Sequence, residues 1–520
     1  MNGAQALVQA LQHSGVDTCF ANPGTSEMHF VAALDGAQGL RCVLGLFEGV
    51  ATGAADGYWR MAGRPAATLL HLGPGLANGL ANLHNAKKAR SGIVNIVGDH
   101  ATGHLALDAP LTSDLEGVAR PMSHWVHRVA SADAVAAAGR EAVQQARRRP
   151  GHIATLALAA DAAWSPLSLP LPDLGPLPEP AFEPLQQPAL QAAVDLLRRD
   201  PGGTLLLLGG AAMRQEAIAW AGRIAAHTGC GLMSEFYVER AARGAGRVPV
   251  PRLPYAVEPA MAALAPWRQI VLVHAMPPVA FFAYPGKPGR LEAPGTGFVH
   301  FSHHGQDATA ALEALADALG ARQARPVLAA ARDRGAALPT GALDAAGIAA
   351  VIAGVLPEQA IVVDEAISTG RSFDAATRQA APHDWLANMG GAIGFGLPVA
   401  VGAALAAPGR RVLALEGDGS AMYTPQALWT LAREGLDVTA VIFANRSYQI
   451  LRGEFAGVGA GEPGPRAAGM LSLDRPALDW VQLSKGFGVP ATRVHDLAQL
   501  ADALRRSFAT PGPSLIEAVL

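Results

Sequence analysis

The sequence has little cysteine. Only three cysteines occur among 520 residues, Cys19, Cys42 and Cys230, and none of them belongs to a CxxC pair. So few and so scattered thiols argue against a disulfide framework and against a structural zinc site. They are typical of a protein that works in a reducing compartment, and we therefore expect a cytoplasmic location.

Charge is also scarce, and no long hydrophobic run is present. Charged residues make up 16% of the chain, and 40 basic against 43 acidic residues leave a net charge of -3. Without a basic excess the chain offers nothing to attract a phosphate backbone, so we expect no nucleic-acid partner. The least polar stretch, roughly 390–408, is interrupted by Gly394, Gly396 and Pro398, so we expect a buried loop and helix there and no membrane span.

What the chain has instead is a 50% apolar composition and enough length for about three domains. Short aliphatic runs that end in Gly or Asp alternate with Ala-rich stretches, the pattern of βαβ units and parallel sheets. The expected strands lie within 66–73, 92–99, 203–210, 269–275, 360–366, 411–419 and 438–445.

Two breaks divide this pattern. Eight prolines within 165–189 predict an extended linker without helix, and a second boundary falls near 322–345. The sequence therefore predicts three doubly wound α/β domains with parallel sheets, at 1–165, 185–325 and 340–520.

The sharpest functional signal lies in the third of these domains. One expected strand runs into Gly417-Asp418-Gly419-Ser420, and the next ends at Asn445. Carboxyl ends of neighbouring parallel strands meet at one edge of a sheet, where open α/β sheets bind ligands. The Asp418 carboxylate, the Asn445 amide oxygen and the Ser447 carbonyl are hard oxygen donors, suited to Mg²⁺ or Ca²⁺ with phosphate oxygens completing the shell.

The glycines of this segment suit an anion. Gly417 and Gly419 let the backbone approach a phosphate, and the start of the following helix favours negative charge. A plain strand-end turn is the alternative interpretation. The helix and strand that fit into the 27 residues between Asp418 and Asn445 favour the binding site.

With this motif the chain resembles the thiamine-diphosphate-dependent 2-oxoacid enzymes, and the resemblance extends over nearly the whole sequence. It implies a pyrimidine-binding N-terminal domain, a central domain and a diphosphate-binding C-terminal domain. It also implies that Asp418, Asn445 and Ser447 hold the metal. The residues placed on the cofactor are Ser368, Gly417, Gly419, Ser420 and Tyr448.

Glu48 is the only acid in the apolar segment LGLFEGVATGAA before Asp56. A buried carboxyl group is costly unless it has a partner, although an acid at the end of a helix or strand is an equal alternative from the sequence alone. The resemblance implies that Glu48 binds N1′ of the cofactor's aminopyrimidine and so helps to remove the C2 proton.

The segment NMGGAIGFGLP (388–398) resembles the loop that bends the cofactor in this family. The resemblance implies that Ile393 lies between the two rings of the cofactor and that the Gly391 carbonyl accepts from the pyrimidine amino group. An ordinary Gly-rich turn from strand to helix is the alternative.

The segments ANPGTSEMHF (21–30) and LLHLGPGLANG (69–79) look most like those of benzoylformate decarboxylases. By this resemblance Thr25 supplies a substrate-binding hydroxyl and His71 is an active-site histidine that handles protons. From the residues alone, Thr25 or Ser26 is expected to cap the helix after the Pro-Gly turn, and a lone His is more often a core residue.

Other positions depart from the benzoylformate decarboxylases. Ala283 stands where they carry a second catalytic His. Ile450 and Glu454 occupy substrate-pocket positions, where a carboxylate disfavours a purely aromatic pocket. Gly209-Gly210 after TLLLL is interpreted as a strand-end turn more readily than as a nucleotide site, and we expect no FAD.

These observations predict a thiamine diphosphate and Mg²⁺ enzyme that decarboxylates a 2-oxoacid, with carboligation as a further capacity. The family implies a homodimer or homotetramer with active sites at subunit interfaces. Two alternatives stay open: an acetolactate-synthase-like carboligase, and a non-catalytic nucleotide- or flavin-binding protein on the same α/β plan.

Overall fold

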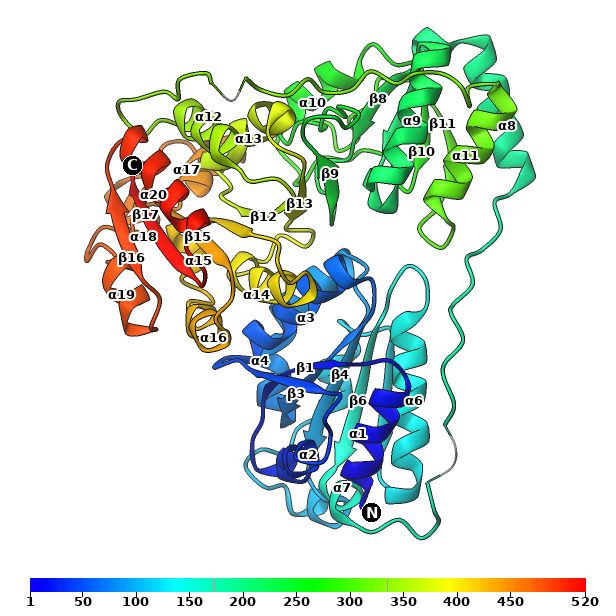
Figure 1. Ribbon diagram of the computed structural model, residues 1–520, viewed down its shortest axis with the longest axis vertical. Helices are drawn as coiled ribbons and strands as arrows, with labels where there is room; N and C mark the ends of the chain where they lie inside the picture. The colour runs from blue at the N-terminus through cyan, green and yellow to red at the C-terminus, as the bar shows by residue number, and fades with distance from the viewer. Residues whose placement is uncertain (172–173, 334) are drawn as a thin grey trace.

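The computed structural model describes residues 1–171, 174–333 and 335–520. Within these ranges the chain forms three α/β units (Figure 1), with the N-terminal unit at one end and the other two beside each other. None of the helices in the described ranges is long and apolar enough to cross a membrane. The predicted class of α/β fold with parallel sheets is confirmed.

The N-terminal unit contains a six-stranded, all-parallel sheet in the order β2-β1-β3-β4-β6-β5. Its strands are β1 (Thr18–Asn22), β2 (Arg41–Leu44), β3 (Ala66–His71), β4 (Ile93–Asp99), β5 (Trp125–Val129) and β6 (Ile153–Ala159). Its helices are α1 (Gly3–His13), α2 (Met28–Leu34), α3 (Glu48–Ala62), α4 (Leu72–Lys88), α5 (Leu115–Ala119), α6 (Ala132–Arg147) and α7 (Ala160–Trp164). Every residue of β4 and β6 is buried, as expected for strands covered by helices on both faces.

The central unit has a four-stranded parallel sheet in the order β11-β10-β7-β8. Its strands are β7 (Thr204–Leu208), β8 (Gly231–Ser234), β10 (Gln269–Val273) and β11 (Gly297–Ser302), and its helices are α8 (Gln187–Arg199), α9 (Gln215–Thr228), α10 (Val257–Leu264) and α11 (Ala308–Leu319). One expectation is wrong: α8 begins inside the proline-rich stretch. Pro188 lies in its first turn, where a proline costs little because the missing N–H would have no helical partner. Residues 172–173 of that stretch lie outside the described residues.

The C-terminal unit has a seven-stranded sheet in the order β16-β17-β15-β14-β12-β13-β9. Six of its strands come from the C-terminal part of the chain. They are β12 (Ala360–Glu365), β13 (His383–Ala387), β14 (Val412–Gly417), β15 (Val438–Ala444), β16 (Ala491–Val494) and β17 (Ser514–Val519). Its helices are α12 (Ala345–Val355), α13 (Phe373–Ala376), α14 (Gly396–Ala406), α15 (Asp418–Ala421), α16 (Ala427–Glu434), α17 (Gln449–Gly457), α18 (Pro465–Met470), α19 (Trp480–Gly486) and α20 (Leu497–Ala509).

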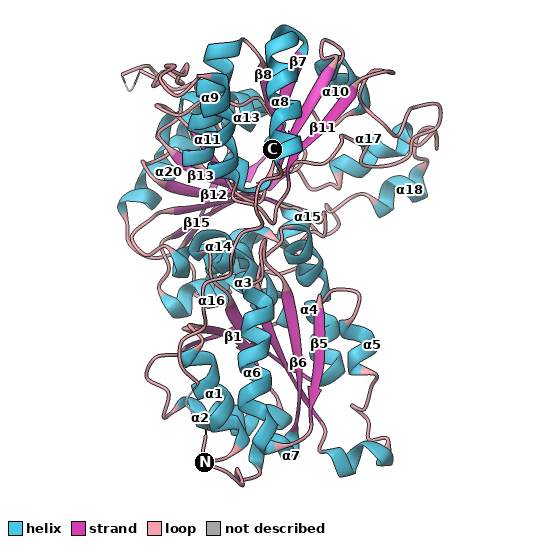
Figure 2. Ribbon diagram, turned by 90° about the vertical axis from the view of Figure 1, so that its right-hand side faces the viewer, coloured by secondary structure: helices cyan, strands magenta, loops and turns pink. Residues whose placement is uncertain are grey.

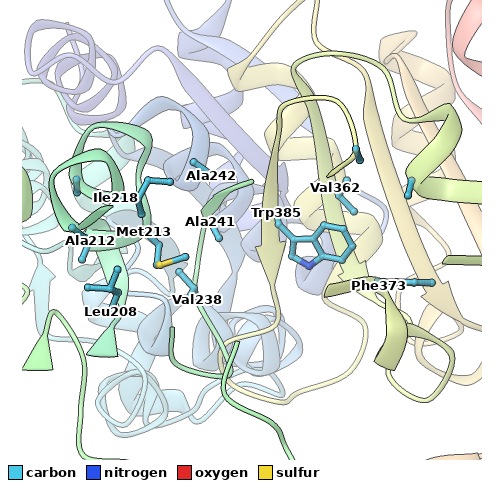
Figure 3. Packing of buried hydrophobic residues seen from close by; sticks show 14 of the residues in the cluster. Leu208, Ala212, Met213, Ile218, Val238, Ala241, Ala242, Val362, Phe373 and Trp385 are labelled. Atoms are coloured by element: carbon cyan, nitrogen blue, oxygen red, sulfur yellow. The ribbon is translucent and has the colours of Figure 1, made fainter. Parts of the chain in front are cut away.

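The seventh strand, β9 (Ala241–Arg243), comes from the central part of the chain and pairs antiparallel with β13. The central and C-terminal units also share one buried apolar cluster, in which Met213 and Val238 lie on one side and Trp385 and Phe373 on the other (Figure 3). Since a strand and a core are shared, these two units form one body, and the domain boundaries expected from the sequence stay a prediction.

Helices α3 and α14 join the N-terminal and C-terminal units (Figure 2). Small residues allow their backbones to approach closely: a Cβ at Gly57 would collide with the Val399 carbonyl, and one at Gly402 with the Ala54 carbonyl. Glu48 begins α3, and the segment 388–395 leads into α14. This packing therefore holds two of the predicted cofactor elements near one junction.

Candidate active site

A first group of polar side chains lies where β1 and β3 end. The N-terminal sheet reverses its strand order between these two strands, and open α/β sheets bind ligands outside such a switch point. His71 is the last residue of β3, and Glu27 follows β1 in a short 3-10 turn, Thr25–Glu27. His71 Nδ1 lies 2.7 Å from Glu27 Oε2, so a carboxyl group orients the imidazole.

The Glu27 carboxyl is almost fully buried, and burial raises its pKa. The backbone N–H of Gly24 donates to Oε2 over 2.7 Å, whereas Oε1 has no partner among the described residues. The prediction that Thr25 or Ser26 caps the following helix is wrong, because no side chain caps α2 and it is Glu27 that reaches back to the turn. The sequence analysis missed Glu27. The available signal was an acid in the Pro-Gly turn, but its partner lies 44 residues away.

Glu48 is the first residue of α3 and is half-buried. Asn78 Nδ2 donates to its Oε2 over 2.9 Å. A Cβ at Gly75 would lie 3.0 Å from Glu48 Oε1 and 3.4 Å from His71 Cβ, so both side chains border the same glycine. The two residues predicted to be catalytic thus lie at one place in the N-terminal unit.

A second group of polar residues lies where β12, β14 and β15 end, again at a reversal of strand order. Asp418 begins the single-turn helix α15 and is buried, which raises the pKa of its carboxyl group. Its Oδ1 accepts from Gly419 N over 3.0 Å and its Oδ2 from Arg446 N over 2.7 Å. These bonds fix the carboxylate between the ends of β14 and β15.

The remaining members of this group converge on the same edge. Asn445 Nδ2 lies 3.5 Å from Ser368 Oγ, and Asn445 Oδ1 accepts from Ser447 N over 3.0 Å. The Ser447 side chain points elsewhere, because its Oγ donates to the Leu471 carbonyl and accepts from Arg452 Nε. The structure therefore brings the predicted metal residues together with Ser368.

The other predicted cofactor residues surround this edge. Ser420 Oγ donates to the Gly417 carbonyl over 3.1 Å. The Tyr448 ring covers Gly419, since a Cβ there would lie 2.5 Å from Tyr448 Cε1. Among the described residues no three His, Cys, Asp or Glu side chains form a metal cluster. Asp418 supplies a carboxylate at this edge, and any ion there would also depend on amide, carbonyl and ligand oxygens.

The segment 388–398 connects the two groups of polar residues. Gly391 has a left-handed φ of 77°, and Ile393 beside it is half-buried. Asn82 Nδ2 on α4 donates to the Gly394 carbonyl over 3.1 Å and to the Gly49 carbonyl over 2.8 Å. One side chain thereby links the neighbours of Glu48 and of Ile393 within a single chain.

Two buried carboxyl groups, those of Glu365 and Glu416, lie against this segment. Glu365 accepts from Phe395 N over 3.2 Å, from Gly396 N over 2.9 Å and from Asn388 Nδ2 over 3.2 Å. Glu416 is fully buried beside it, and neither of its oxygens has a hydrogen-bond partner in the described residues. Burial raises the Glu365 pKa to about 7, and burial together with the Glu365 charge raises the Glu416 pKa well above its usual value. The sequence analysis did not identify this pair.

The predicted substrate residues lie on α17 and in the turn after β1. Thr25 is exposed, and Ile450 and Glu454 lie one helical turn apart. Glu454 Oε2 accepts from Tyr284 Oη over 2.8 Å, across 170 residues of sequence. Ala283 is exposed beside Tyr284, so no imidazole stands there.

The sheet of the central unit also ends beside polar side chains, next to Gly209 and Gly210. A Cβ at Gly209 would collide with Glu235, and one at Gly210 would lie 2.6 Å from His304 Nδ1. His274 is buried there, and neither of its ring nitrogens has a described partner. Side chains therefore fill the space above this strand-end turn.

Comparison with known proteins matches two parts of the chain to a family. Residues 1–118 match the N-terminal TPP-binding domain of thiamine pyrophosphate enzymes, and residues 369–518 match the C-terminal one. A Mycobacterium tuberculosis protein, provisionally named acetolactate synthase large subunit IlvX, is 50% identical over 528 residues, covering 100% of this chain and 99% of that protein.

Benzoylformate decarboxylase of Pseudomonas aeruginosa is 30% identical over 542 residues, covering 98% of this chain and 97% of that enzyme. The solved structure of the Rhodococcus jostii thiamine diphosphate-dependent 4-hydroxybenzoylformate decarboxylase matches with a TM-score of 0.83. It is 26% identical, and the match covers 99% of this chain and 98% of that one. The chain therefore belongs to the family of thiamine pyrophosphate enzymes that includes benzoylformate decarboxylase and proteins related to acetolactate synthase.

Proposed function

We propose that this protein is a thiamine diphosphate- and Mg²⁺-dependent decarboxylase of a 2-oxoacid. The observation that carries the proposal is the shared position of Glu48 and the Glu27–His71 pair, which border Gly75 and Gly24 at one switch point. The cofactor site needs an acid for the pyrimidine, and the substrate needs a group that exchanges protons. This arrangement offers both, from separate residues.

The oxygen donors at the ends of β14 and β15 fit a hard divalent ion. Asp418 supplies a carboxylate, Asn445 an amide oxygen and Ser447 a main-chain carbonyl, the donors that Mg²⁺ prefers and that Ca²⁺ also accepts. Asp418 and Asn445 are held by backbone N–H groups, so their oxygens are pre-oriented. Ser368, Gly417, Gly419, Ser420 and Tyr448 would border the diphosphate.

When bound, the cofactor supplies the electron sink that makes loss of CO₂ from a 2-oxoacid feasible. Glu48 would bind N1′ of the pyrimidine and hold a proton there, and the Gly391 carbonyl would accept from its amino group. Ile393 would pack against the cofactor's rings. His71, held at Nδ1 by Glu27, would exchange protons with the substrate through Nε2, and the Thr25 hydroxyl would donate a hydrogen bond to the substrate.

An acetolactate-synthase-like carboligase is the second candidate, favoured by the 50% identity to the provisionally named acetolactate synthase subunit. A flavin- or nucleotide-binding protein without catalysis has less support, because Glu235 and His304 fill the space above Gly209-Gly210. We further propose a homodimer or homotetramer, with active sites shared between subunits, in the cytoplasm.

A screen of 2-oxoacids for CO₂ release, with added thiamine diphosphate and Mg²⁺, tests the proposal. Release of CO₂ with formation of the corresponding aldehyde supports a decarboxylase. Acetolactate formed from pyruvate would indicate the carboligase instead. No CO₂ release from any aliphatic, aromatic or charged 2-oxoacid would contradict the proposal.

A further inference from the structure

We propose that the substrate's side chain ends in a cation, such as a guanidinium or an ammonium group, which Glu454 binds beside an aromatic wall. The wall consists of Tyr255, Phe281, Phe282 and Tyr284 from the central unit. The inference rests on the proposed function, because it names the class of 2-oxoacid for that same site.

The wall leads from the segment predicted to bend the cofactor to Glu454. A Cβ at Gly391 would lie 3.4 Å from Phe281 Cζ, so this ring lies next to the glycine expected to accept from the pyrimidine. The ring centroids of Phe281 and Phe282 are 5.0 Å apart, and those of Phe282 and Tyr284 are 6.5 Å apart. Tyr284 then donates to Glu454 over 2.8 Å. A substrate held at the cofactor and extended along these rings would bring its far end to a carboxylate.

Contacts within the chain leave part of this aromatic wall exposed to solvent. Phe281 is 44% exposed and Phe282 is 52% exposed, which is unusual for adjacent phenylalanines. Tyr255 packs against Phe281, with ring centroids 5.4 Å apart, and forms the second side of the surface. The exposed apolar area lies between the segment 388–398 and α17, where a ligand's side chain could cover it.

Glu454 lacks a cationic partner. Its only hydrogen-bond donor among the described residues is the neutral Tyr284 hydroxyl, and no Lys, Arg or His in those ranges forms an ion pair with it. Two of the cations near the wall pair with other carboxylates. Lys287 lies 5.5 Å from the Tyr284 ring centroid and pairs with Glu258 over 2.7 Å, while Arg252 lies 3.9 Å from Asp374.

This combination favours a cation over an uncharged tail. A carboxylate that an apolar group removes from water loses hydration without gaining a partner, whereas a guanidinium or ammonium group forms a charge-assisted hydrogen bond with it. Aromatic faces add a further attraction for the same cation. A wholly aromatic substrate would use the rings and leave the Glu454 charge uncompensated.

Glu454→Gln tests the inference, because it keeps the size of the side chain and removes only its charge. We expect the ratio of kcat/KM for a 2-oxoacid with a terminal guanidinium or ammonium group to kcat/KM for an uncharged acid of equal length to fall at least about tenfold. Glu462→Gln, on an exposed loop beyond α17, is the matched control and should change neither value.

Calorimetry of the same cationic 2-oxoacid with the cofactor-loaded protein provides a readout that is independent of turnover. Weaker binding in Glu454→Gln, with wild-type affinity in Glu462→Gln, supports the inference even if no substrate is turned over and the proposed reaction fails. Turnover of uncharged acids together with equal binding of the cationic acid by wild type and Glu454→Gln would overturn the inference and leave the proposed function intact.

Discussion

The edge predicted to bind the diphosphate and the surface predicted to meet the substrate are built differently. Around Asp418 and Asn445, neighbouring backbone N–H groups fix the side-chain oxygens, and these contacts span at most 28 residues of sequence. Around His71 and Glu454, the fixing groups are side chains, Glu27 and Tyr284, at separations of 44 and 170 residues. A site fixed by local backbone can therefore be recognised in a short motif, whereas the substrate surface depends on how distant segments pack.

This difference has a consequence for mutations. Changes at the diphosphate edge should act through cofactor affinity, since the backbone there holds the ligands. Changes on the N-terminal and central surfaces should spare cofactor affinity and act on turnover or substrate choice. The following variants test that division, from the largest expected effect to the smallest.

Glu48→Gln should lower kcat by about 10²–10⁴-fold, because an amide cannot exchange a proton with the pyrimidine. The variant should keep its fold and its diphosphate binding, since an amide oxygen can still accept the hydrogen bond that Asn78 donates to Glu48. Steady-state kinetics and circular dichroism check both points, with the exposed Glu141→Gln as control. Near-normal turnover would refute the assigned role.

His71→Ala should lower kcat by about a hundredfold and alter the dependence of rate on pH, because the proton-exchanging group is removed. Glu27→Gln should cost less, about tenfold, because it weakens only the orientation of the ring. Measuring kcat as a function of pH for both variants compares the two effects. If His71→Ala leaves rate and profile unaltered, this part of the proposed mechanism is wrong.

The smallest effect is expected from the buried carboxyl pair behind the segment 388–398. Burial raises the pKa of Glu365 to about 7 and raises that of Glu416 well above its usual value, so the folded state binds these protons more tightly than the unfolded state. Their stabilising effect is complete below the unfolded pKa of about 4.3 and is lost as the pH rises through about 7. We expect the wild-type Tm to fall between about pH 6 and pH 8, and Glu416→Gln to reduce that fall by a few degrees. A fall of equal size in the variant would count against this pair as its origin.

The sequence predicted much of the fold and part of the site. Each of the seven expected strands is present, because aliphatic runs that end in Gly or Asp are a local signal. It did not predict β9, a three-residue strand that joins a sheet formed by later residues, or the helix that begins at Gln187 in spite of Pro188. Tertiary packing decides such short elements.

The site residues also divide into those that a short motif reveals and those that depend on distant partners. The GDGS and Asn445 positions were recognised because strand ends at a fixed spacing have a physical meaning. Glu27, Tyr284 and the Glu365–Glu416 pair were missed, because each acquires its role only from a partner that the fold brings to it. The roles given to the predicted site residues stay proposals until the variants are measured.

Titration calorimetry of thiamine diphosphate at fixed Mg²⁺ tests the central claim most directly, because that claim is an ion-anchored diphosphate at the ends of β14 and β15. Asp418→Ala should weaken binding by about a hundredfold or more and abolish its dependence on Mg²⁺, while the exposed Asp502→Ala should bind as wild type. Unchanged affinity in Asp418→Ala would contradict the account.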